Sequence, residues 1–231
     1  MRKKTTIPPT LKIIEVLAEH KEFEQYKMKN ATGFSYRTIL RALKPLEELK
    51  LIRLVRKEPS EKGGKDKKIY AITFKGLYRH LSEIELDTPD GKKKLDQIAR
   101  RFPEMLLFFK KWPLFVKARI QDKMLDYFNT ALRTSLIGYK NRISWFMAHQ
   151  KSAEHFNEFM ADSDSSMGEF LDTFVIFGSL YVPENREVLT PIYAQDQEII
   201  NLVNKVVTAT EKHQKRIEEV QTLLSGYIGE V

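Results

Sequence analysis

Only two short segments of this sequence have the pattern of β-strands, so any β-structure in the fold must be small. The segments, residues 51–56 and 69–73, are rich in Leu, Ile, Val and Tyr, and the polar loop KEPSEKGGKDKK separates them. They predict a β-hairpin with a basic tip. Because apolar residues recur at helical spacing before and after this hairpin, the expected fold class is mainly α with a small β-hairpin.

Three helical segments are expected before the hairpin. The first covers about residues 10–20, and the second covers about residues 23–30 with Tyr26 facing inward. A turn with Gly33 follows, and Ser35 then caps a third helix that has a buried apolar stripe. Two short helices joined by a turn of three to four residues are typical of a helix-turn-helix.

The third helix carries cations along one side. Arg37, Arg41 and Lys44 are spaced i, i+4 and i+7, so they stack on one face. Arginine can donate two hydrogen bonds to guanine O6 and N7, and a helix fits the major groove of duplex DNA. For the helix taken alone, a solvated face that binds nothing is the favoured interpretation. The candidate DNA-binding residues on this helix and in the hairpin are Ser35, Tyr36, Arg37, Thr38, Arg41, Lys44, Lys57, Lys62, Lys65, Lys67 and Lys68.

The order of these elements resembles a known family. The segments ATGFSYRTILRALKPLEELKLIRLVRK and KKIYAITFKGLYRHL are similar to the winged helix-turn-helix of prokaryotic transcription regulators, broadly the MarR-like families. Residues 70–76, YAITFKG, match the Y-x-(L/I)-T-x-x-G segment that begins the next helix in those families. The resemblance covers about residues 8–81 and implies a recognition helix in the major groove and a basic wing on the backbone or minor groove. Lys50 departs from the pattern, since many relatives have glycine there. A lysine in a left-handed conformation costs about 1 kcal/mol, so either the helix ends differently here or this strain is tolerated.

Charge is distributed unevenly along the chain, whose net charge is +8. Residues 1–81 hold 20 Lys and Arg against 9 Asp and Glu, while residues 152–231 hold 5 against 14. A basic first part is typical of a protein that binds a polyanion. A solvated surface with uneven charge would give the same numbers, so charge alone does not decide between these two interpretations.

Past the hairpin the pattern is helical. Residues 87–91, DTPDG, interrupt it and predict a winged helix-turn-helix domain over residues 1–86, followed by a C-terminal all-α domain over residues 92–231. The aromatic residues between 102 and 146 either form the core of that domain, stack on single-stranded bases or line the pocket of an anionic ligand, and helical spacing favours the core. A loop is expected between the prolines at 183 and 191.

The last segment, residues 195–224, repeats apolar residues in alternating steps of four and three. Such a heptad seam either pairs with a second copy of the helix or packs inside its own domain. Self-pairing is favoured because winged-helix regulators usually bind as dimers. The residues expected to form this dimer contact are Ile199, Val203, Val206, His213, Ile217, Val220 and Leu224.

Catalytic and metal sites lack their usual signatures. The chain has no Cys, which excludes disulfides, thiolate zinc sites and a cysteine nucleophile. It also lacks a Gly-rich phosphate loop, a G-x-S-x-G motif and an H-E-x-x-H motif. A metal group can be drawn from His149, Glu154, His155 and Glu158, but a spacing of six residues does not place the two histidines on one helical face. We therefore expect no enzyme activity, no cofactor and no metal.

These observations predict a sequence-specific double-stranded DNA-binding transcription regulator that forms a homodimer. A small-molecule effector of unknown identity is compatible with the second domain. The alternative is a winged-helix protein–protein adaptor in a transcription or replication assembly, which has no need of cations on both the helix and the hairpin. No segment has the apolar length of a membrane span, and the start of the chain lacks the apolar core of a secretory signal, so we expect a cytoplasmic protein.

Overall fold

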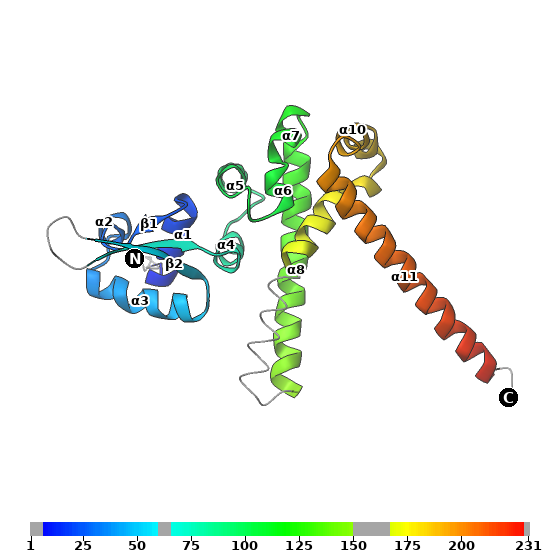
Figure 1. The fold of residues 1–231 in the computed structure, drawn as a ribbon, viewed down its shortest axis with the longest axis horizontal. Helices are drawn as coiled ribbons and strands as arrows, with labels where there is room; N and C mark the ends of the chain where they lie inside the picture. Colours follow the sequence, from blue (N-terminus) through cyan, green and yellow to red (C-terminus); the bar gives the residue numbers. More distant parts are fainter. Residues whose placement is uncertain (1–6, 60–65, 150–166, 229–231) are drawn as a thin grey trace, which may run out of the picture. The chain divides into compact units, whose positions relative to one another are not determined.

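The computed structural model describes residues 7–59, 66–149 and 167–228 (Figure 1). As expected, the chain is mainly helical and contains a small antiparallel sheet, here of three strands. None of the helices in these ranges is long and apolar enough to cross a membrane.

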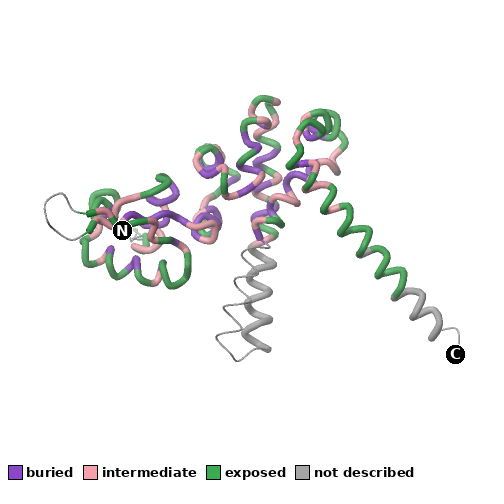
Figure 2. Tube along the Cα trace, viewed as in Figure 1, coloured by how far each residue is buried: buried purple, intermediate pink, exposed green. Residues whose placement is uncertain are grey.

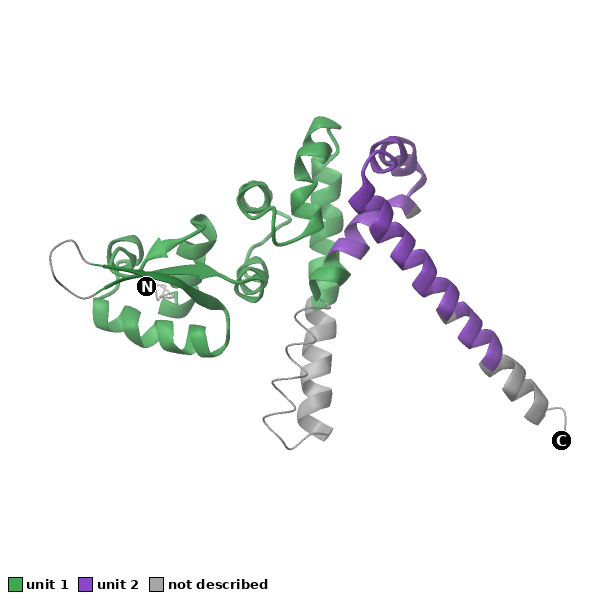
Figure 3. Cartoon of the chain, viewed as in Figure 1, with its two compact units in different colours: residues 1–171 green, residues 172–231 purple. Residues whose placement is uncertain are grey.

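The chain divides into two compact units, Met1–Leu171 and Asp172–Val231 (Figure 3). Residues 87–91, where the sequence predicts a domain boundary, lie inside the first unit. The two predicted domains therefore differ in extent from the two units, and the division at 87–91 stays a prediction. We describe each unit by itself.

Three short elements begin the first unit: α1 (Pro9–Glu19), β1 (Phe23–Glu24) and α2 (Met28–Thr32). The single helix predicted over residues 23–30 is wrong. Phe23 instead lies opposite Tyr70 of a distant strand, and the backbone N–H of Gln25 donates to the Lys68 carbonyl at 2.9 Å. Helical periodicity over eight residues cannot reveal such pairing, because its partner lies more than forty residues away.

Helix α3 spans Tyr36–Glu48 and begins as the sequence predicts. Gly33 makes the preceding turn with a φ of 75°, a left-handed conformation that glycine adopts without steric cost. The Ser35 hydroxyl oxygen accepts a hydrogen bond from the Thr38 backbone N–H at 3.2 Å, which caps the helix. Lys50, just past the helix end, has a φ of 55°, so of the two alternatives the strained left-handed conformation is the one present.

Strands β2 (Ile52–Glu58) and β3 (Lys67–Ile72) form the predicted hairpin, and β1 pairs with the other side of β3. Both strands extend further toward the hairpin tip than predicted. Lys57, Lys67 and Lys68 therefore lie on strands and not in the loop, because the ladder continues through the pairs Lys57–Lys68 and Glu58–Lys67. A register shift between Leu54 and Arg56 marks a β-bulge in β2.

The next helix, α4, spans Phe74–Leu81. Thr73 caps it, because its hydroxyl oxygen accepts from the Gly76 N–H at 3.1 Å and its hydroxyl group donates to the Lys50 carbonyl at 2.7 Å. One side chain thus joins the end of α3 to the start of α4.

The helices that follow in the first unit include α5 (Pro89–Arg101), α6 (Leu107–Lys110), α7 (Trp112–Lys117) and α8 (Gln121–His149). Pro89 begins α5, so three of the five residues of the predicted DTPDG break form the first turn of a helix. Proline is tolerated there because the backbone N–H that it lacks would have no partner within the helix. The single helix predicted from Phe115 to Tyr139 is divided at Arg119, which has a φ of 57°. There the Ile120 N–H returns to the Phe115 carbonyl at 3.1 Å and closes α7.

An aromatic cluster forms the core of these helices, which Figure 2 shows as buried segments of α6, α7 and α8. The ring of Phe108 lies 5.1 to 5.9 Å, centroid to centroid, from those of Phe109, Trp112, Phe115 and Phe128. All five side chains are fully buried. This confirms the core interpretation for them and leaves no ring face for bases to stack on. Three further aromatic residues of α8 have side chains that the structure does not describe, namely Tyr139, Trp145 and Phe146.

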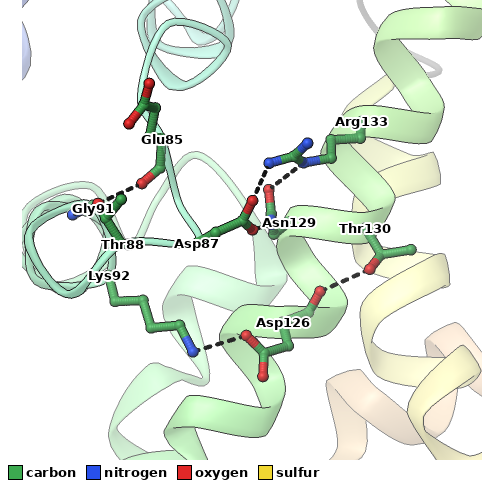
Figure 4. A network of polar contacts seen from close by, with 9 residues as sticks. All are labelled: Glu85, Asp87, Thr88, Gly91, Lys92, Asp126, Asn129, Thr130 and Arg133. Carbon is green, nitrogen blue, oxygen red and sulfur yellow. Dashed lines mark hydrogen bonds and ion pairs between the residues drawn. The ribbon is translucent and has the colours of Figure 1, made fainter.

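Polar contacts tie the link between α4 and α5 to α8 (Figure 4). Asp87 accepts hydrogen bonds from Asn129 and Arg133 of α8. Lys92 of α5 pairs with Asp126 of α8 at 2.9 Å. The predicted boundary segment is therefore fixed on both of its sides within the first unit.

The helical elements of the second unit, as far as the structure describes it, are η1 (Thr173–Phe177), η2 (Gly178–Tyr181), α10 (Pro183–Tyr193) and α11 (Gln197–Ile228). The loop predicted between Pro183 and Pro191 is wrong, since both prolines belong to α10. Pro183 occupies the first turn, and Pro191 lies in the last, where the loss of one backbone hydrogen bond interrupts little of the helix. Tyr193 is held by a hydrogen bond of 3.2 Å with the buried Ser179 hydroxyl.

Candidate nucleic-acid interface

The exposed face of α3 carries the three cations that the sequence groups together. Arg37, Arg41 and Lys44 are all exposed, while the opposite face of the helix is buried. That buried face consists of Ile39, Ala42, Leu43 and Leu46. The core side of α3 thus determines that the cations point outward.

The two arginines of this face are not neutralised by nearby carboxylates. Among the residues that the structure describes, neither Arg37 nor Arg41 has an ion-pair partner. Lys44 lies 3.8 Å from Glu48, and both side chains are exposed, so this pair is weak and easily exchanged for another partner. The guanidinium groups therefore keep all their donors available for an external acceptor.

The candidate residues at the start of α3 have a structural role. The hydroxyl oxygens of Ser35 and Thr38 lie 2.9 Å apart, and Ser35 also accepts from the Thr38 backbone. These bonds fix the first turn of α3 and hence the direction of Arg37. Contact of Ser35 and Thr38 with DNA stays a prediction.

Three exposed apolar side chains lie beside the cations. Tyr26, Tyr36 and Leu40 are 67%, 38% and 43% exposed, and we call them the apolar patch. The rings of Tyr26 and Tyr36 are 5.8 Å apart, centroid to centroid. The inward orientation predicted for Tyr26 is wrong, because the chain forms β1 and a turn before α2 and not one amphipathic helix. Leu40 lies three residues after Arg37 and four before Lys44, which places it on the cationic face. This spacing is visible in the sequence and indicates Leu40 as a further candidate DNA-binding residue.

The hairpin lysines divide into two groups. Lys57 is exposed on β2, and Lys67 and Lys68 are half-buried on β3. Lys62 and Lys65, at the predicted tip, lie outside the described residues. The structure thus brings Lys57, Lys67 and Lys68 together near the described end of the hairpin.

Arg56, also on β2, already has two carboxylate partners. It donates to Glu22 and, at 2.8 Å, to Glu58, and these hydrogen bonds raise the pKa of its guanidinium group. Arg56 therefore joins β2 to the segment before β1 and differs from Arg37 and Arg41 in having carboxylate partners.

A cavity of about 430 Å³ lies between α1, α4 and the start of α5. Its walls include Leu11, Ile14 and Ile84, together with the half-buried His80, whose pKa is lowered by burial. Several of its carboxylates already have cationic partners, as in the pair Glu83–Arg79. The volume suits a small molecule, while the effector itself stays a prediction.

The predicted dimer seam on α11 is buried within the second unit at its start and exposed further along the helix. Ile199 is fully buried, Val203 and Val206 are half-buried, and Ile217 is 37% exposed. The first part of the seam thus packs inside its own unit, and the part around Ile217 does not. The structure does not describe the side chains of the other seam residues, His213, Val220 and Leu224.

The structure adds no metal centre to these sites. Within the described ranges, no group of three or more His, Asp or Glu side chains could hold a metal ion. The structure does not describe the side chain of His149, and Glu154, His155 and Glu158 lie outside those ranges.

Comparisons with family models, with curated proteins and with solved structures found no match to this chain.

Proposed function

We propose that this protein is a sequence-specific double-stranded DNA-binding transcription regulator whose helix α3 enters the major groove. The observation that carries the proposal is the pair Arg37 and Arg41, exposed on one face of a capped helix and without carboxylate partners among the described residues. Arginine donors in this arrangement match the acceptors of guanine and of phosphate.

The element order around α3 supports a winged helix-turn-helix. A glycine turn precedes α3, and an antiparallel hairpin with Lys57, Lys67 and Lys68 near its described end follows it. In this proposal α3 is the recognition helix, and the hairpin is the wing that contacts the backbone or minor groove. Phosphate neutralisation by these cations predicts an affinity that falls steeply with salt.

The second candidate function is a protein–protein adaptor. The apolar patch favours it, because exposed aromatic residues are common in protein interfaces. The cations favour DNA, because Arg37 and Arg41 on the helix and Lys57 on the hairpin are all exposed, and an adaptor has no need of cations on both elements. Selection of bound duplexes from a random pool separates the two functions, because an adaptor enriches no sequence.

Arg41→Ala is expected to remove about 1 to 3 kcal/mol of discrimination at one base pair, because a mid-helix arginine is placed to reach a base edge. Lys67→Ala, on the hairpin, is expected to weaken all duplexes alike. The measurement is the affinity of the full chain for a selected duplex and for its scrambled version, across a salt series. Lys117→Ala removes the same charge from an exposed position on α7 and is the matched control. Equal losses on both duplexes with Arg41→Ala would make Arg41 a phosphate contact.

We further propose that the protein is a homodimer paired through the exposed part of the α11 seam. A dimer predicts an inverted-repeat site with half-sites about 10 bp apart. Ile217→Asp places a charge in the paired seam at a cost of about 3 kcal/mol, which raises the dimer Kd about a hundredfold. Because Ile217 is 37% exposed within its own unit, the variant is expected to remain helical.

Light scattering and circular dichroism on Ile217→Asp test this dimer. Thr208→Asp, at an exposed position on the other side of α11, introduces the same charge outside the seam and is expected to stay dimeric. A variant Ile217→Asp that is still dimeric and helical would move the dimer contact to another surface.

A further inference from the structure

Leu40 lies on the same exposed face of α3 as the cations. It follows Arg37 by three residues and precedes Lys44 by four, and residues at these spacings are neighbours on a helix surface. Its side chain is 43% exposed, although α3 buries its other leucines at 43 and 46. The helix therefore offers one aliphatic contact within a surface that otherwise offers hydrogen-bond donors.

The aromatic pair borders this contact on one side. Tyr36 precedes Leu40 by one helical turn, and its ring lies 5.8 Å from that of Tyr26. The apolar patch is thus continuous with the cationic face. A partner that fits both must present acceptor atoms for Arg37 and Arg41 and an apolar group for Leu40 within about one helical turn.

The major groove presents such a combination. Guanine offers the O6 and N7 acceptors that pair with arginine, and thymine offers a C5-methyl group, the one apolar group on a base edge there. We propose that Leu40 recognises the C5-methyl of a thymine in the bound sequence, next to a guanine contacted by Arg37 or Arg41. This inference rests on the proposed function and names the base that the helix selects besides guanine.

The experiment removes one methyl group at a time from the DNA. The full chain first selects duplexes from a random pool, and each thymine of the selected duplex is then replaced in turn by uracil, which lacks only the methyl group. At one position, uracil is expected to weaken binding by the wild-type protein about fourfold, the value of one buried methyl. Leu40→Ala is expected to bind the thymine and uracil duplexes equally at that position.

Two further variants make the test specific. Leu49→Ala changes another exposed leucine at the end of α3 and is expected to keep the fourfold uracil effect. Leu40→Gln lengthens the side chain by one atom and offers an amide, so a new selection is expected to replace this thymine by adenine. Both changes lie on the exposed surface, and circular dichroism verifies the fold of each variant.

The outcomes separate the inference from the function on which it rests. If every uracil substitution affects wild type and Leu40→Ala equally, Leu40 does not recognise the methyl, while DNA binding stands. If the selection enriches no duplex, the proposed function and this inference both fail, and the patch is a surface for a protein partner.

Discussion

Phe108→Ala is expected to lower the free energy of unfolding of the first unit by about 3 to 5 kcal/mol. Phe108 is fully buried at the centre of the aromatic cluster, where its ring contacts those of Phe109, Trp112, Phe115 and Phe128. Alanine leaves a cavity that rings from three different helices line, and these helices cannot all move in to fill it.

Urea unfolding of the full chain, followed by near-ultraviolet circular dichroism, measures this loss. Phe108→Leu is the graded control, because it keeps most of the apolar volume and is expected to cost clearly less than alanine. A loss below about 1 kcal/mol for Phe108→Ala would show that the cluster is loosely packed and would reopen a ligand-binding role for these aromatic residues.

Gly76→Ala is expected to cost the same unit about 3 kcal/mol, at the upper end for added volume in a packed site. A Cβ at this position would lie 2.0 Å from the Leu51 carbonyl oxygen and 2.9 Å from the Ile72 side chain. The carbonyl group cannot easily move away, since it accepts the Thr73 N–H at 3.1 Å. The glycine of the YAITFKG segment is therefore required by the close approach of α4 to the start of β2.

Gly33→Ala is the matched control for this prediction. Gly33 has a φ of 75°, but a Cβ at this position would have no heavy atom within 4 Å, so alanine there is strained without any clash. The expected cost is about 1 kcal/mol. Thermal unfolding compares the two variants, and equal losses would contradict the argument that the contact with Leu51 dominates at Gly76.

The parts of the fold that could be predicted are those specified by nearby residues. The cap at Ser35, the turn at Gly33 and the strain at Lys50 each depend on one local backbone conformation. The strand at Phe23 could not be predicted in this way, because it depends on pairing with Tyr70. The helix around Pro191 was missed because proline in a last helical turn costs less than in a helix interior.

The candidate site shows the same division. The orientation of Arg37, Arg41 and Lys44 follows from the helical period, which a single sequence contains. The exposure of Tyr26 depends on β1, a strand that forms only when β3 is in place, so the apolar patch needed the structure. The heptad pattern likewise predicted a seam on α11, but only the packing of its own unit separates the buried Ile199 from the exposed Ile217.

The attachment of α4 to the later helices has a consequence for protein engineering. The Tyr78 hydroxyl lies 3.0 Å from the Ser135 hydroxyl of α8, and Arg101 donates to the Ala18 carbonyl of α1 at 2.9 Å. A chimaera that borrows only residues 7–81 would remove both partners and uncover one side of α4. The transferable cassette is therefore the longer segment through α8, and a graft of the helix and hairpin alone would need a redesigned surface where α5 and α8 now lie.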